Sequence, residues 1–119
     1  VYVVDSGEVE STPDEVREDL RDALDDHGES ALAEVEDAAA ARDPELDVTV
    51  DVREGRPAAE IAGYAREVDA DVVAMGTRGR HGENRFLIGS VAERVVRTCP
   101  VPVLTVRQLT DEDPRRTTI

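Results

Sequence analysis

The sequence contains no tryptophan and no lysine, and it has few aromatic residues of any kind. Aromatic side chains make up 3% of its 119 residues, so a hydrophobic core must be built mainly from Val, Leu, Ile and Ala. No apolar run approaches the ~20 residues of a membrane-spanning helix, and the N-terminus lacks the basic segment and cleavage site of a secretory signal. These absences predict a cytoplasmic protein of one ordinary-sized domain, without a membrane partner.

Cysteine is nearly absent as well, because Cys99 is the only one. An internal disulfide is therefore excluded. Cys99 ends an apolar stretch before Pro100, and we interpret it as a small buried hydrophobic residue rather than a nucleophile. The acidic residues are scattered and no Cys/His cluster occurs, so no metal site is predicted.

The charge is strongly one-sided, with 28 acidic residues against 14 basic ones and a net charge of −14. Such a surface repels DNA, RNA and anionic lipid, so no nucleic-acid partner is predicted. A high acid content without lysine is typical of proteins from salt-loving archaea, where a Debye length of ~3 Å at 1 M salt screens the general field. The alternative is a GC-rich genome, in which arginine replaces lysine for coding reasons.

Short apolar runs alternate with helical repeats along the chain. Gly28 interrupts the first repeat, which leaves open one long helix with a weak point or two shorter helices. The alternation predicts an α/β fold with a parallel sheet, helices on both faces, and ligand binding beyond the carboxyl ends of the strands. Strands are expected at 1–4, 48–52, 71–75 and 100–106, and helices at 13–42, 57–68 and 90–97.

Two capping boxes are predicted at helix starts. Thr12 and Glu15 have the required spacing at the start of the first long helix, with Pro13 at its first position. Ser90 and Glu93 have the same spacing at the start of the last helix.

A glycine-rich segment, GTRGRHGENRFLIGS at 76–90, connects the third expected strand to the last helix. Glycines allow close backbone approaches, and exposed N–H groups in such a turn can surround phosphate oxygens. The following helix start adds unpaired N–H groups and a favourable dipole. Three arginines could add cationic groups: Arg78, Arg80 and Arg85. The segment therefore predicts a phosphate-binding loop.

The spacing G-x2-G-x9-G-S between a strand and a helix resembles the nucleotide-binding motif of the universal stress protein family. The resemblance covers residues 1–107, leaving 108–119 as a polar tail, and implies a three-layer, Rossmann-like α/β domain of the adenine nucleotide alpha hydrolase-like type. The family sheet has five strands, of which four are expected here. Its first strand lies between the second and fourth, so the strands at 1–4 and 71–75 are expected to lack that neighbour and either to leave unpaired edges or to pair differently.

The resemblance also implies a ligand and its contacts. The ligand would be ATP, with AMP or ADP as alternatives, and Mg²⁺ would arrive with the phosphates. The nucleotide contacts, including two loop arginines chosen for their charge, are Val3, Met75, Gly76, Thr77, Arg78, Gly79, Arg80, Gly89, Ser90 and Val91. Val3 would line the adenine pocket, although plain core packing is the alternative. The family often dimerises through its last strand, here Val101 to Val106.

Three functions remain open on this reading. The first is a dimeric, ATP-binding stress-response module, the second is a nucleotide-free interaction module of the same fold, and the third is a slow ATPase. The Walker pattern is absent and no lysine could complete it, so we predict no catalytic residue and at most slow hydrolysis.

Overall fold

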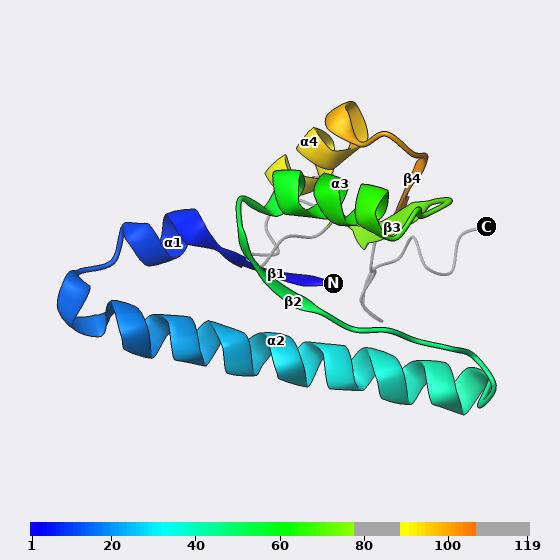
Figure 1. Cartoon of the computed structure of the whole chain (residues 1–119), viewed down its shortest axis with the longest axis horizontal. Coiled ribbons are helices and arrows are strands. Elements are labelled where there is room, and N and C mark those ends of the chain that lie inside the picture. The colour runs from blue at the N-terminus through cyan, green and yellow to red at the C-terminus, as the bar shows by residue number, and fades with distance from the viewer. Residues whose placement is uncertain (78–88, 107–119) are drawn as a thin grey trace, which may run out of the picture. The chain divides into compact units, whose positions relative to one another are not determined.

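The computed structural model describes residues 1–77 and 89–106, and its contacts divide the chain into two units. The first unit is Val1–Tyr64 and the second begins at Ala65. Figure 1 labels the helices and strands along the chain. In chain order the elements are β1 (Tyr2–Asp5), α1 (Ser6–Glu10), α2 (Asp14–Arg42), β2 (Val52–Gly55), α3 (Pro57–Glu67), β3 (Val73–Gly76), α4 (Ser90–Thr98) and β4 (Val103–Val106). The expected alternation of strands and helices is confirmed, with α1 as an addition.

The sheet of the first unit consists of β1 and β2, which run parallel in a register from Tyr2 opposite Val52 to Asp5 opposite Gly55. Val4 of β1 is fully buried. The predicted strand at 48–52 is misplaced, because only the residues opposite the four-residue β1 find partners in the ladder. The alternating valines before Val52 therefore lie outside the strand.

Helix α1 follows β1 directly and has no counterpart among the predicted elements. The Asp5 carboxylate accepts a hydrogen bond of 2.9 Å from the backbone N–H of Gly7 and so caps the helix. Val9 is 1% exposed and anchors α1 in the core. The Asp5-Ser6-Gly7 segment ends the strand as expected, but it does so by starting a helix.

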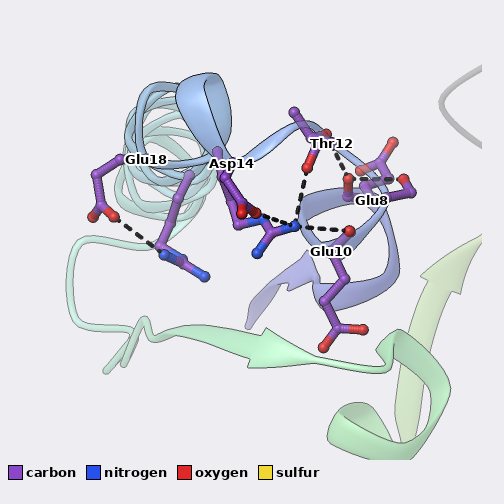
Figure 2. A network of polar contacts seen from close by, with 8 residues as sticks. Glu8, Glu10, Thr12, Asp14 and Glu18 are labelled. Carbon is purple, nitrogen blue, oxygen red and sulfur yellow. Dashed lines mark hydrogen bonds and ion pairs between the residues drawn. The ribbon is translucent and has the colours of Figure 1, made fainter.

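The predicted capping box of Thr12 and Glu15 is wrong. The Thr12 hydroxyl donates back to the carbonyl of Glu8 at 2.8 Å, as Figure 2 shows, and Thr12 lies one residue before the N-cap of α2. The N-cap of α2 is Pro13, which makes no side-chain capping bond, and the helix begins at Asp14 rather than at the proline.

Arg17 holds the corner between α1 and α2. Its Nη2 donates to the backbone carbonyls of Glu10 and Thr12, each at 3.1 Å, and pairs with the Asp14 carboxylate at 2.9 Å (Figure 2). One guanidinium group thereby fixes the end of α1, the connecting segment and the first turn of α2.

A second arginine on the same helix joins α2 to the sheet. The Arg21 Nε donates to Oε1 of Glu54 in β2 at 2.9 Å. This hydrogen bond and the carboxylate charge raise the pKa of Arg21 above its usual range. Both side chains are partly exposed, so the pair orients the helix more than it stabilises it.

Helix α2 is continuous over its 29 residues, and Gly28 is a packing site rather than a weak point. Gly28 is buried, and a Cβ added to it would lie 2.5 Å from Cδ1 of Tyr2. The Tyr2 ring therefore packs against the helix backbone, and it meets the His27 ring edge-on at 5.8 Å between centroids. Of the helices in the described ranges, none is long and apolar enough to cross a membrane.

The second unit contains the parallel pair β3 and β4, in a register from Val73 opposite Val103 to Gly76 opposite Val106. The expected strands at 71–75 and 100–106 are thus confirmed with shifted or shortened bounds. Helix α4 buries Ala92 and Val95, which are 3% and 0% exposed.

The four strands form two separate two-stranded sheets within the described ranges. There, β1 pairs with β2 alone and β3 pairs with β4 alone. This agrees with the expectation that the strands near 1–4 and 71–75 lack a neighbour. Each of the two keeps one edge whose backbone groups have no ladder partner among the described residues.

Gly28→Ala should destabilise the protein by about 1–3 kcal/mol, because the added methyl group would overlap the Tyr2 ring. Gly63 in α3 is the matched control, since a Cβ there meets nothing within 4 Å. Gly63→Ala should stabilise the protein by about 0.5–1 kcal/mol. Chemical unfolding at high salt measures both changes, and a stabilising Gly28→Ala would contradict the packing of Tyr2.

Candidate functional site

The candidate site lies where β3 ends and α4 begins, both in the second unit. Thr77 follows β3, and its N–H donates to the carbonyl of Val106 at 3.1 Å. This bond continues the pairing with β4 by one residue beyond Gly76. The end of β3 is therefore fixed by its neighbouring strand.

Gly89, at the start of α4, touches the end of β3. Its backbone has φ of 86° and ψ of 151°, a conformation that is essentially restricted to glycine. A Cβ added there would lie 2.9 Å from the carbonyl oxygen of Thr77. Glycine is required at this position for both reasons. Thr77 and Gly89, the residues on either side of segment 78–88, therefore lie next to each other.

The start of α4 carries no side-chain cap. Its N-cap is Gly89, whose carbonyl accepts the first helical bond, from the N–H of Glu93 at 3.0 Å. The predicted capping box of Ser90 and Glu93 is wrong, because Ser90 is the first helical residue and not the N-cap. The Glu93 carboxylate instead pairs with Arg97 one turn later, at 3.0 Å.

Among the described residues, the first backbone N–H groups of α4 have no hydrogen-bond partner. Those of Ser90, Val91 and Ala92 precede the first intrahelical donor, and no described side chain caps them. Ser90 is exposed and Val91 is 38% exposed, so an anion can reach this end of the helix. Unpaired N–H groups and the helix dipole together favour an anionic ligand.

The structure brings together most of the predicted contacts that it describes. Thr77 and Gly89 are in contact, and their chain neighbours Gly76 and Ser90 lie beside them, with Met75 in β3 and Val91 in α4. The remaining predicted contacts of the loop lie outside the described residues: Arg78, Gly79 and Arg80.

Val3 belongs to the first unit, where it is half-buried in β1 opposite Arg53. Its assignment to an adenine pocket stays a prediction. Sequence reasoning missed the part played by Val106, whose carbonyl fixes Thr77. No sequence signal could have revealed this contact, because it depends on the register of two strands far apart in the chain.

The described part of the site offers hydrogen-bond donors and hydroxyl groups rather than metal ligands. Within residues 1–77 and 89–106, no group of three or more His, Cys, Asp or Glu side chains could hold a metal ion. The chemistry suited to this junction is therefore the binding of an anion by main-chain N–H groups, helped by the hydroxyls of Thr77 and Ser90.

A family model provides the decisive comparison, because the model of the universal stress protein family matches residues 1–107. The chain belongs to the universal stress protein family. A universal stress protein of Methanocaldococcus jannaschii is 37% identical over 109 residues, which cover 91% of this chain and 63% of that relative. One from Methanothermobacter thermautotrophicus is 36% identical over 108 residues, covering 90% of this chain and 73% of that relative.

Solved structures agree on the fold. The hypothetical protein MJ0577, whose structure served a structure-based assignment of biochemical function, matches with a TM-score of 0.74 and 26% identity. The match covers 91% of this chain and 73% of that one. The hypothetical protein PH0823 matches in fold with a TM-score of 0.69. The predicted three-layer α/β fold with parallel strands flanked by helices is thus confirmed.

Ser90→Ala should change the free energy of unfolding by less than about 0.5 kcal/mol, because the Ser90 side chain makes no capping bond. Loss of a true N-cap side chain would instead cost about 1 kcal/mol. Thermal or chemical unfolding distinguishes the two cases. A loss of about 1 kcal/mol in the free energy of unfolding would show that Ser90 does cap the helix.

Proposed function

We propose that this universal stress protein is a cytoplasmic stress-response module that binds ATP, or AMP or ADP, with its phosphates at the junction of β3 and α4. The observation that carries the proposal is Gly89, which brings the start of α4 against Thr77 and leaves the helix start uncapped. The N–H groups of Ser90 and Val91 are the proposed phosphate donors. Mg²⁺ would be held mainly by the phosphates and water.

The negative charge of the chain sets the conditions under which such a site works. A net charge of −14 opposes the approach of a polyphosphate in dilute salt. At molar salt the general field is screened within ~3 Å, while hydrogen bonds from fixed N–H groups remain. Binding through the main chain therefore suits a protein that functions at high ionic strength.

We also propose a homodimer formed through β4. Pro102 and Val106 direct their carbonyls to β3, so the alternation along the strand turns the backbone groups of Val103 and Thr105 toward the other edge. Leu104 and Val106 are 58% and 53% exposed. A second copy of the strand would cover these side chains and pair with that edge.

Gly89→Ala should lower the affinity for ATP at least tenfold, measured by calorimetry at molar salt, because the Cβ collides with Thr77 and distorts the junction. Gly63→Ala is the control and should bind like the unaltered protein. Ser90→Ala, which should not disturb folding, is expected to weaken binding by about 0.5–1.5 kcal/mol, the net worth of one hydrogen bond.

The same titration tests the alternative functions. If the unaltered protein takes up no ATP, AMP or ADP at any salt concentration, it is a nucleotide-free interaction module. Release of phosphate that depends on Mg²⁺ and exceeds that of Ser90→Ala would identify a slow ATPase. Equal affinity of the Gly89→Ala and Gly63→Ala variants for ATP would refute the proposed site.

Thr105→Pro should convert the dimer into a monomer, because proline removes the N–H that faces the free edge of β4. The fold should persist, since proline is tolerated on the open side of an edge strand. Light scattering after size-exclusion chromatography measures the molar mass. A variant that stays dimeric would place the interface elsewhere.

A further inference from the structure

The last turns of α2 extend beyond the strands that the helix packs against. Its 29 residues correspond to about 43 Å, whereas a four-residue strand spans only about 13 Å. Leu32 is the last buried residue of the helix, and from residue 33 onward every residue except Ala39 is exposed. Val35 lies on the face that continues from Gly28 and Leu32, and it is 55% exposed.

Beyond α2 the chain turns and runs back along the helix toward β2 (Figure 1). An open hollow of about 480 Å³ lies between this returning segment and the last turns of α2. We call it the α2 hollow, and its lining residues are Glu36, Asp37, Ala40, Leu46, Asp47 and Val48.

The α2 hollow combines apolar side chains with carboxylates. Its apolar side chains come from Ala40, Leu46 and Val48, and Leu46 is 56% exposed although it is large and hydrophobic. The other lining residues are all carboxylates, and within the described ranges none of them forms a salt bridge with an arginine. An exposed leucine beside carboxylates that have no described cationic partner is typical of a surface that binds a partner.

The arrangement of the carboxylates limits which kind of ligand or partner the α2 hollow can bind. They are not a metal site, because the described residues contain no group of three or more acids that could hold an ion. A second copy of α2 would bring like charges together, which opposes self-association. A lysine or arginine side chain fits both parts, since its aliphatic stem packs on apolar surface while its cationic head stays in water near the acids.

We propose that the α2 hollow is a docking site for a basic segment of a partner protein, which places a lysine or arginine stem on Leu46 and its charge among Glu36, Asp37 and Asp47. This surface belongs to the first unit and does not depend on the proposed nucleotide site. The carboxylates set the orientation and speed of the encounter, and Leu46 supplies the contact that persists when salt screens the charges.

The test uses the full chain and a synthetic amphipathic peptide of leucine and lysine as the probe, with a leucine and glutamate peptide for comparison. Leu46→Ser should lower the affinity for the lysine peptide at least fivefold. Val16→Ser is the control, because Val16 is 47% exposed on α2 but does not line the hollow. Both changes preserve net charge, so general attraction to the acidic surface is the same in each.

A second pair of variants tests the charges without altering the apolar part. Glu36→Gln removes a lining carboxylate, and Glu34→Gln removes an exposed carboxylate of the same helix outside the hollow. We expect Glu36→Gln to weaken the peptide complex at least threefold more than Glu34→Gln does. Equal effects within each pair, or equal affinity for the glutamate peptide, would overturn the proposal and leave only non-specific attraction.

Discussion

Direct contact between the backbones of Gly89 and Thr77 is the constraint on which the candidate site depends. Because the two residues meet, the end of β3 and the start of α4 are held at one place, whatever the path of the residues that connect them. The ladder between β3 and β4 supports this contact from one side, and the burial of Ala92 and Val95 supports it from the other. The first N–H groups of α4 therefore lie beside the end of β3, and no described side chain caps them.

The excess of acid has opposite consequences in the two units. At the β3–α4 junction the negative charge opposes the approach of the proposed anionic ligand. The main-chain N–H groups of α4 can still form hydrogen bonds at high salt, where the general field is screened. Along the end of α2 the same excess creates a surface that selects cations, provided that apolar contact supplies part of the affinity. At both surfaces, short-range hydrogen bonds and apolar contacts therefore contribute more to binding than the electrostatic field of the whole chain does.

The order of the strands and helices was predicted well from local patterns, whereas the helix caps and the exact strand bounds were not. Pro57 starts α3, the alternation of strands and helices is correct, and the glycine spacing places both anchor points of the loop. The bounds of β2 depend on what β1 can pair with, which no local pattern contains. The cap at Ser90 failed by one residue, because Gly89 can adopt a positive φ and serve as the N-cap itself.

The packing of Tyr2 on Gly28 has a practical consequence for spectroscopy. The chain has two tyrosines and no tryptophan, so its intrinsic ultraviolet emission comes from Tyr2 and Tyr64. Tyr2 lies against α2, and Tyr64 lies beneath the guanidinium of Arg53 at 4.7 Å. Both fluorophores belong to the first unit. Tyrosine fluorescence therefore reports on the packing of β1 against α2 and of Arg53 against α3, because the chain has no tyrosine or tryptophan after Tyr64.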